Sequence, residues 1–355
     1  MRHAFPLQYA KRKMESRLHI HAVTKEMQYL MIETARYRIE RFEDHGWHIT
    51  ALSEPVAWPT VYVSTEPDPR ALNFSQLEPL PWKDHGVLTI RLSQRMRHYV
   101  HLHHGDHIET FSDRIVPLEG GINFRDLGGY RNPQGQMVRW GTLYRSGKLS
   151  GLTSRDQAYI RQLGIQVVCD LRSAHELQTD PTPPDLAPSL AHLPLKLRET
   201  SSVPGHIDQE TAQALLRESY EAFPTSLESY TAFFRTLLDN ESGAVLFHCT
   251  AGKDRTGVTA ALLLWALDIP WDLIVEDFLI SNQFSAQLAT LVATQDKTVG
   301  PTHPLWPMAR AYPENLRAAI HVILNEYGDL NRFFTHGLGL EKDWKDALQH
   351  KYLVS

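Results

Sequence analysis

Over the first third of the chain, short runs of residues alternate between apolar and polar with period two. Such alternation is typical of strands that bury one face. Turn-rich stretches at 66–69 and 79–86 separate the runs. The pattern predicts a flexible start at 1–16 and then an antiparallel, sandwich-like β domain over residues 17–117, of immunoglobulin or fibronectin type. The predicted strands are 17–23, 37–42, 58–63, 87–92 and 99–103.

From residue 118 onward the apolar positions follow a helical period, interrupted by short apolar runs. An amphipathic helix is predicted at 154–163, capped by Thr153 or Ser154, and a buried strand at 165–169. Segment 177–207 is rich in Pro and Ser and is predicted to be a mobile loop over the site. This order predicts an α/β domain over 118–355, with a mainly parallel sheet flanked by helices. Further helices are predicted at 209–223, 227–238, 271–282, 284–295, 313–327 and 341–353.

One strand-to-helix boundary carries the candidate chemistry. The apolar run 244–247 stops at a His-Cys pair, and a buried helix is predicted at 258–267. A loop in this position points successive N–H groups and the positive end of a helix dipole at one place, so it binds an anion, most naturally phosphate. The candidate binding residues in this loop are Thr250, Ala251, Gly252 and Lys253.

Side chains in and beside this loop suit nucleophilic catalysis. Cys249 lies at a predicted helix N-terminus beside Lys253 and Arg255, which favours the thiolate. Arg255 has the planar fork to hold two oxygens of a tetrahedral anion. The Thr256 hydroxyl would hydrogen-bond the sulfur, and His248 would fix the loop through its backbone. Together they predict a catalytic phosphate site.

The segment HCTAGKDRTG at 248–257 resembles the signature HCxxGKDRTG of the bacterial cysteine-based tyrosine phosphatases, a group that includes secreted mycobacterial and listerial tyrosine and lipid phosphatases. The resemblance covers about residues 119–355, and it places Arg125 among the candidate substrate-binding residues. Further segments that match are INFRDLGGY at 122–130, LYRS at 143–146, VCDLRS at 168–173 with Glu176, YEAFP at 220–224 and EYG at 326–328.

The resemblance implies a tyrosine-phosphatase-like fold and hydrolysis of phosphate monoesters in two steps. Cys249 would attack phosphorus, and water would then release the phosphocysteine. No metal or cofactor is implied, because Arg255 and the loop amides supply the positive charge. The implied substrates are phosphotyrosine proteins, with phosphoserine or phosphothreonine as further targets, or phosphoinositides. Lys253 adds a cation that phosphotyrosine alone does not need, which suits a polyanionic substrate.

The general acid has two candidates. The family usually takes this acid from a separate loop, but the sequence has no Trp-Pro-Asp segment. Asp254 is the nearer candidate, although an Asp at this position also caps a helix or pairs with a neighbouring Arg. Asp170 is the next candidate. With Arg172, it follows a predicted strand and so emerges at the carboxyl edge of the sheet, where ligands bind in α/β folds.

Two other functions remain as alternatives. A rhodanese-like sulfurtransferase also places a Cys in an anion-binding loop after a strand, but Arg255-Thr256 and His248 favour phosphate chemistry. The protein could instead be a phosphoryl-binding module, with the N-terminal domain recruiting a partner. Thiosulfate activity without phosphatase activity would indicate the first alternative. Loss of action on the natural substrate after truncation near residue 118 would indicate a recruiting role.

Composition limits the remaining function classes. A net charge of −5 argues against general binding to nucleic acid, and no apolar stretch approaches the length of a membrane span. No standard secretory signal is visible near the N-terminus, and 2 cysteines make no disulfide framework. We therefore expect a cytoplasmic protein without integral membrane association, while the resemblance leaves secretion without a standard signal open. The sequence does not indicate an oligomeric state.

Two further features have plain structural interpretations. The histidines at 98, 101, 103, 104 and 107 lack an acidic or Cys partner at metal-ligand spacing, so we interpret them as an exposed polar face rather than a metal site. Strand alternation turns Cys169 away from the side of Asp170. We therefore expect Cys169 in the core, and a regulatory disulfide with Cys249 is the less favoured reading.

Overall fold

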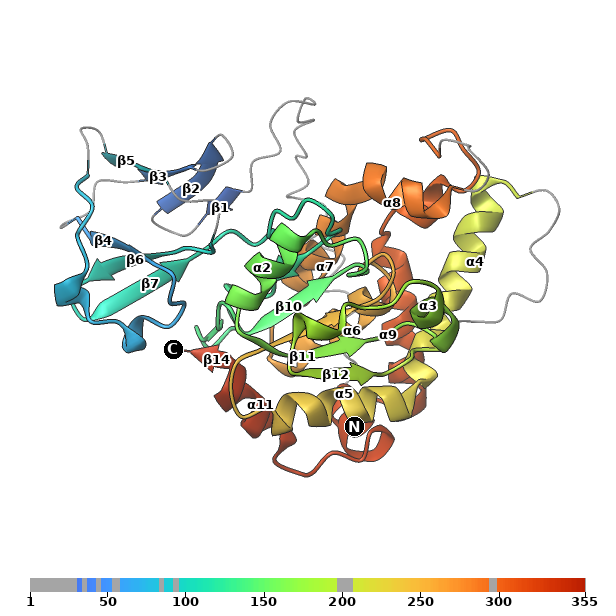
Figure 1. The fold of residues 1–355 in the computed structure, drawn as a ribbon. Helices are drawn as coiled ribbons and strands as arrows, with labels where there is room; N and C mark the ends of the chain where they lie inside the picture. Colours follow the sequence, from blue (N-terminus) through green and yellow to red (C-terminus); the bar gives the residue numbers. More distant parts are fainter. Residues whose placement is uncertain are drawn as a thin grey trace.

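The structure is a computed structural model, and it shows a β-rich N-terminal unit beside a larger α/β region (Figure 1). It describes residues 31–33, 37–42, 46–52, 58–82, 86–91, 96–196, 207–293 and 299–354. The predicted flexible start at 1–16 and the predicted strand at 17–23 lie outside these residues.

Two antiparallel sheets form the N-terminal unit. The sequence predicted β2, β4, β5 and β6 within two residues at each end, but it missed β1, β3 and β7. The first sheet has the order β1 (Met31–Glu33), β2 (Tyr37–Phe42), β3 (Gly46–Ala51), β5 (Val87–Arg91). The second has the order β4 (Thr60–Ser64), β6 (Tyr99–His104), β7 (His107–Phe111).

The two sheets share one apolar core. Alternate positions of β3 and β5 turn Trp47, Ile49, Leu88 and Ile90 inward, as period two requires. Strands of the second sheet add further buried side chains to the same cluster, namely Val61, Val100, Leu102 and Phe111. Apolar packing between two sheets therefore holds this unit together.

The histidine prediction is wrong for His101. Its side chain is fully buried and hydrogen-bonds Ser64 Oγ at 2.8 Å and Thr110 Oγ1 at 3.0 Å. The reason is a short 3₁₀ turn at Phe74–Gln76, whose Phe74 ring packs edge-on to His101 and stacks on His103. Among the described residues, no group of three or more His, Cys, Asp or Glu is arranged to hold a metal.

A five-stranded mixed sheet lies at the centre of the α/β region. Its order is β12 (Ser189–His192), β11 (Ile165–Asp170), β13 (Ala244–His248), β10 (Leu143–Ser146), β8 (Arg125–Asp126). The first four strands run parallel, and β8 is antiparallel to β10. Ser146 and Asp170 both pair with His248, so the carboxyl ends of three strands meet at one edge.

Helices cover both faces of this sheet (Figure 1). Alternate residues of β13 separate the two cores: Phe247 belongs to the larger cluster, and Leu246 packs with Ile160 of α2 on the other face. The helices are α2 (Ser154–Gln162), α3 (Ala174–Thr179), α4 (Gln209–Ala222), α5 (Leu227–Asp239), α6 (Arg255–Ala266), α7 (Trp271–Ile280), α8 (Ser285–Val292), α9 (Pro313–Tyr327), α10 (Leu330–Arg332) and α11 (Trp344–Tyr352). Of the two predicted caps, Thr153 is the one that caps α2, in a capping box with Asp156.

Segment 177–207 is more structured than the prediction of a mobile loop. It contains the end of α3, a 3₁₀ turn at Pro184–Leu186 and the strand β12, which pairs with β11. β12 lies at the sheet edge and is mostly exposed, so it lacks the apolar pattern that identifies a strand. Residues 197–206 lie outside the described part.

Specific contacts join the two regions. Arg97 of the N-terminal unit donates a hydrogen bond to Asp126 Oδ2 at 3.0 Å, and both side chains are buried. The Trp140 indole N–H donates to the Thr110 carbonyl at 3.0 Å, and Trp140 packs with Tyr99 and Met137. Nearby, β9 (Met137–Val138) pairs with β14 (Leu353–Val354) at the end of the chain.

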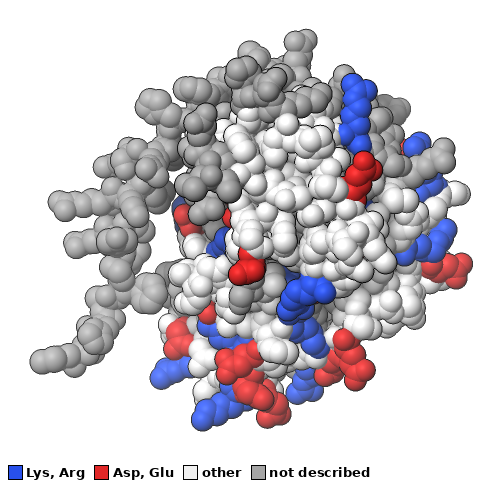
Figure 2. Space-filling model, turned by 90° about the vertical axis from the view of Figure 1, so that its left-hand side faces the viewer, with Lys and Arg blue, Asp and Glu red and all other residues white. Residues whose placement is uncertain are grey.

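Seen from the side of the N-terminal unit, the molecule shows few charges at the centre of the view, and acidic and basic side chains mix along the lower and right-hand margins of the view (Figure 2). No helix of the described residues combines the length and apolarity needed to cross a membrane.

Candidate active site

The loop that carries Cys249 follows the central strand β13 and leads into α6. Its backbone is held from below: Asn123 Nδ2 donates to the carbonyls of Ala251 at 3.2 Å and of Gly252 at 3.0 Å. The Lys148 amide donates to the Thr250 carbonyl at 3.0 Å. Because these carbonyls are bonded on the protein side, the loop keeps a fixed curvature around the nucleophile.

Gly252 is required by this curvature. It has a φ of +65°, and a Cβ there would lie 2.5 Å from the backbone of Ser146 and Gly147. A larger residue would therefore meet both a conformational and a steric penalty. The glycine lets the loop pass directly against the end of β10.

Arg255 is the first residue of α6, and Glu176 holds its guanidinium. Nη1 and Nη2 each donate to one carboxylate oxygen at 2.7 Å, and the Thr250 hydroxyl donates to the same carboxylate. Burial would raise the pKa of Glu176, but its bonds to Arg255 lower it well below the usual range. The same ion pair raises the pKa of Arg255, although burial of the guanidinium acts to lower it. The guanidinium is thus charged and fixed in orientation.

Glu176 is itself positioned by a helix start. Ser173 caps α3, and the Glu176 carboxylate accepts from the Ser173 amide at 2.9 Å. The capping signature Ser-x-x-Glu is visible in the sequence, but the pairing with Arg255, 79 positions away, is not.

Asp254 forms a small cluster with Lys253 and Tyr220. Its carboxylate accepts from Lys253 Nζ at 2.6 Å and from the Tyr220 hydroxyl at 2.7 Å. Lys253 also donates to the Arg310 carbonyl at 2.9 Å. Asp254 occupies the N-cap position of α6 without a side-chain capping bond. The capping alternative considered for Asp254 is therefore not what the structure shows.

Asp170, Arg172 and His248 lie behind the loop. Arg172 donates to Asp170 through Nε at 2.9 Å and Nη2 at 2.7 Å, and also binds the Asp180 carbonyl and the Thr182 hydroxyl. His248 Nε2 lies 3.5 Å from Asp170 Oδ2. Burial lowers the pKa of His248 to about 4. The donors of Arg172 are thus engaged within the protein.

Arg125 belongs to a buried ion cluster beneath the loop. Asp277 on α7 accepts from Arg125 Nε at 3.0 Å and from Arg145 Nη1 at 2.6 Å. Arg145 then donates to the Gly252 carbonyl at 2.9 Å, and Arg125 donates to Asn123 Oδ1. Burial would raise the pKa of Asp277, but the two guanidinium charges lower it to about 2. We call Asn123, Arg125, Arg145 and Asp277 the loop-support cluster.

Thr256 is fully buried, and its hydroxyl oxygen has no hydrogen-bond partner among the described residues. A buried hydroxyl without a hydrogen bond lowers the stability of the fold unless a ligand or another group forms that bond. Cys249 is 2% exposed, and both Cys249 and Cys169 are free thiols. Cys169 lies in the larger core, as predicted, and burial raises its pKa to about 12.

The structure thus places the predicted residues 249–256 together in the loop and the first turn of α6. It places Asp170 and Arg172 with His248 behind the loop and Arg125 below it. The roles of all these residues stay predictions. Sequence reasoning missed the contacts of Glu176, Tyr220, Asn123, Arg145 and Asp277. The visible sign for Asp277 was its place, next to Glu276, between the apolar residues of α7.

Comparison with known proteins decides the family. The sequence profile described as the tyrosine phosphatase family matches residues 116–354. The chain belongs to the tyrosine phosphatase family. It is an enzyme of this class, and its α/β region is a tyrosine-phosphatase-like domain built on a mixed sheet.

Its relatives include the triple specificity protein phosphatase PtpB of Mycobacterium tuberculosis, 31% identical over 62% of this chain and 92% of that protein. A Cupriavidus necator protein, whose name provisionally assigns it to the tyrosine-protein phosphatases, is 32% identical over 62% of this chain and 82% of that protein. A tyrosine-protein phosphatase of Nostoc commune is 34% identical over 39% of this chain and 48% of that protein.

Solved structures show a weaker likeness. P. aeruginosa TpbA in complex with pTyr matches with a TM-score of 0.23 and 18% identity, over 43% of this chain and 76% of that one. The core catalytic domain of a PP-IP phosphatase from S. cerevisiae matches with a TM-score of 0.26 and 13% identity, over 60% of this chain and 96% of that one. These scores are too low to add to the family assignment.

Proposed function

We propose that this tyrosine phosphatase hydrolyses phosphate monoesters through a phosphocysteine at Cys249. The observation that carries the proposal is the loop between β13 and α6, in which Arg255 is charged, buried and held by two hydrogen bonds. A phosphate placed over Cys249 would meet the loop amides, the N-terminus of α6 and this guanidinium. Cys249 Sγ then bonds to phosphorus as the ester oxygen leaves.

We propose Asp254 as the acid that protonates the leaving group and, in the second step, as the base that activates water. Its side chain is 22% exposed and lies in the loop, so it can reach both solvent and substrate. The Asp170 side chain is 8% exposed and is occupied by Arg172 and Thr182. Exposure and free lone pairs therefore favour Asp254.

The Thr256 hydroxyl fits the role of a donor to the sulfur. A buried hydroxyl without a protein partner gains a bond when a thiolate forms nearby, and this lowers the cost of expelling the sulfur from phosphocysteine. His248 is neutral at pH 7 because its pKa is about 4, so it fits a role in holding the loop rather than in proton transfer.

For the substrate, we propose phosphotyrosine proteins, with phosphoserine, phosphothreonine and phosphoinositides as further candidates. The name of the M. tuberculosis relative, a triple specificity phosphatase, supports a broad range. The Lys253 side chain is fully buried and bonded to Asp254, so a second phosphate group must draw it away from that partner. A Lys253→Met variant that lowered kcat/KM equally for phosphotyrosine peptide and phosphoinositide would remove the support for a polyanionic substrate.

For the architecture, we propose a sandwich-like N-terminal domain over 17–117 and a phosphatase domain over 118–355. The shared apolar core of the two N-terminal sheets supports this division. A recruiting role for the N-terminal domain remains the alternative. We also propose a reducing compartment such as the cytoplasm, because the thiol nucleophile must stay reduced.

The test is hydrolysis of p-nitrophenyl phosphate by wild type, Cys249→Ser and Cys169→Ala, in reductant with a chelator. We expect wild type and Cys169→Ala to be active and Cys249→Ser to lose activity by several orders of magnitude. Activity that survives in Cys249→Ser, or that the chelator abolishes, would contradict the proposal. Sulfur transfer from thiosulfate without phosphatase activity would favour the rhodanese-like alternative.

A further inference from the structure

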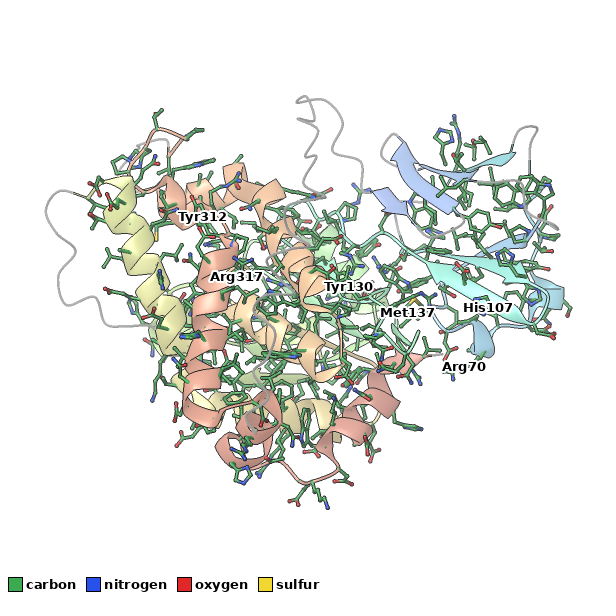
Figure 3. The ribbon with its side chains drawn as sticks, turned by 180° about the vertical axis from the view of Figure 1, so that it is seen from behind. Arg70, His107, Tyr130, Met137, Tyr312 and Arg317 are labelled. Carbon is green, nitrogen blue, oxygen red and sulfur yellow. The ribbon has the colours of Figure 1, made fainter. Side chains whose placement is uncertain are left out.

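A cavity of about 640 Å³ lies between the N-terminal unit and the phosphatase domain. Its phosphatase wall includes Thr142, Gly164 and Ala244, at the amino ends of β10, β11 and β13. Figure 3 shows Arg70 and His107 on the N-terminal side of this junction and Met137 beside it on the phosphatase side. Cys249 follows the opposite, carboxyl end of β13, so the cavity is separate from the candidate active site.

Much of the cavity wall is apolar and comes from both regions. Trp140 and Met137 are buried side chains of the phosphatase domain, and the Trp140 indole N–H is already bonded to the Thr110 carbonyl. The apolar body of a ligand can therefore contact this part of the wall. The indole N–H needs no hydrogen bond from that ligand. The remaining apolar lining residues are Pro67, Pro69, Ile108, Leu163 and Val354.

Three arginines line the cavity: Arg70 from the N-terminal unit, and Arg131 and Arg139 from the phosphatase domain. Arg139 donates through Nε to the Leu353 carbonyl at 2.9 Å and through Nη2 to the His350 carbonyl at 3.4 Å. Its Nη1 has no hydrogen-bond partner in the part of the chain that the structure describes. Arg70 donates through Nε and Nη2 to Asp68 and likewise keeps Nη1. Burial lowers the pKa of Arg139, and the nearby Arg70 charge lowers it further. An anion beside Arg139 would relieve both effects.

Acidic residues limit which anion fits. Asp68, Glu66 and Asp106 also line the cavity, so it carries charges of both signs. Asp68 is neutralised by Arg70, and Glu66 accepts from the Asp68 amide at 3.0 Å. A highly charged polyanion would meet repulsion from all these carboxylates, whereas one anionic group at Arg139 would face mainly Asp68, which Arg70 neutralises.

We propose that this cavity binds a small amphipathic anion, with its single anionic group at Arg139 and its apolar body against Trp140 and Met137. Its volume is in the range of cavities that enclose drug-sized ligands, which are apolar pockets with a few fixed polar groups. Such a ligand contacts both regions at once and therefore stabilises their junction.

The test uses decanoate as the probe, below its micellar range, with calorimetric titration of the full chain. Decan-1-ol has the same apolar body without the charge, and acetate has the charge without the body. We expect saturable binding of one decanoate per chain, and much weaker binding of the other two. Equal affinity for decan-1-ol, equal affinity for acetate, or no saturable decanoate binding would overturn the proposal.

The site is located by variants. Arg139→Met should weaken decanoate binding about tenfold or more, because it removes a charge-assisted hydrogen bond. The control is Arg217→Met, an exposed arginine on α4 paired with Glu221, which should not change it. Unchanged affinity in Arg139→Met would contradict the site.

Because Arg139 also binds the chain end, a second variant fills the cavity from the other wall. Ile108→Trp places a large ring in the space and should abolish decanoate binding, with folding checked by circular dichroism and urea unfolding. A folded Ile108→Trp protein that binds decanoate like wild type would overturn the proposal.

Discussion

The loop-support cluster and the core of the N-terminal unit stabilise their surroundings in different ways. Beneath the catalytic loop, Arg125 and Arg145 share one buried carboxylate. Other donors of the two arginines bind Asn123 and the carbonyls of Gly252 and Asp277. In the N-terminal unit, apolar side chains fill the core. His101, which is buried in its second sheet, is neutral at pH 7 because burial lowers its pKa to about 4.

The difference follows from what each region must hold. A loop whose amides face an anion turns its carbonyls the other way, and fixed donors must then satisfy those carbonyls. Buried charges contribute little net stability, but removing one partner is costly because the other is left unpaired. A β unit that only needs a defined shape can rely on apolar packing. Shortening a side chain in such a core lowers stability in proportion to the volume removed.

The largest expected effect comes from Asp277→Asn. It leaves Arg125 and Arg145 without a counter-charge in a dry site, so the free energy of unfolding should fall by about 3–5 kcal/mol. Activity on p-nitrophenyl phosphate should fall as well, because Arg145 no longer fixes the Gly252 carbonyl. Urea unfolding and steady-state kinetics measure both.

The matched control for Asp277→Asn is Glu221→Gln, which breaks an exposed pair with Arg217. Glu221→Gln should lower the free energy of unfolding by less than about 1 kcal/mol. If Asp277→Asn lost no more stability than this control, the loop would not depend on the buried charges.

Arg97→Met tests the contact that joins the two regions. Asp126 would lose its buried charge partner but keep its bonds from the Gly128 and Gly141 amides, at 2.7 and 2.8 Å. We expect the free energy of unfolding to fall by about 2–3 kcal/mol, which is less than for Asp277→Asn. Calorimetry should show the N-terminal unit melting earlier, with kcat little changed well below that transition.

Arg155→Met, which breaks an exposed pair with Glu119, is the control for Arg97→Met and should leave the melting profile unchanged. A loss of kcat in Arg97→Met as large as that in Asp277→Asn would mean that the N-terminal unit belongs to the loop support.

Lower pH should weaken both regions through their buried histidines. The pKa of His101 and of His248 is about 4 in the folded protein, below the ordinary value of about 6.5. Between pH 7 and pH 5 the unfolded chain therefore binds protons that the folded chain does not, and the free energy of unfolding falls as pH falls. Each histidine should account for about 1–2 kcal/mol of this fall.

His101→Gln separates the two contributions. Its free energy of unfolding should fall by about 1–2 kcal/mol less than that of wild type between pH 7 and pH 5. Urea unfolding at both values measures this difference. An unchanged pH dependence would show that His101 is charged or exposed in the folded state.

Glu176→Gln should give the smallest effect. The amide keeps one acceptor for Arg255 but loses the charge, so kcat/KM on p-nitrophenyl phosphate should fall about fivefold, equivalent to about 1 kcal/mol. Glu210→Gln, which changes an exposed carboxylate in the first turn of α4, is the control. Equal kinetics for the two variants would remove Glu176 from the positioning of Arg255.

The sequence predicted the parts of the fold in which local pattern and structure agree. Helix α9 and strand β2 have the predicted bounds, and the strand-to-helix loop lies where the apolar runs placed it. β12 was missed because an exposed edge strand has no apolar face to show. His101 was misread because the residue that buries it, Phe74, comes from a turn outside the strand pattern.

The candidate site was predictable only in its contiguous part. Residues 248–256 form the end of β13, the loop and the start of α6, so spacing alone brings them together. The contacts of Arg125 and Arg145 with Asp277 join positions 152 and 132 residues apart. No local period records such pairs, because they depend on how α7 packs against the sheet.

The proposed function depends on the transfer of phosphate to Cys249. The most direct measurement is to mix the enzyme with a radiolabelled phosphotyrosine peptide, quench with acid within one turnover and locate the label by mass spectrometry. The account predicts label on the peptide that contains Cys249 in wild type and in Cys169→Ala, and none in Cys249→Ala. Wild-type enzyme that turns over without labelled Cys249, or label retained in Cys249→Ala, would contradict it.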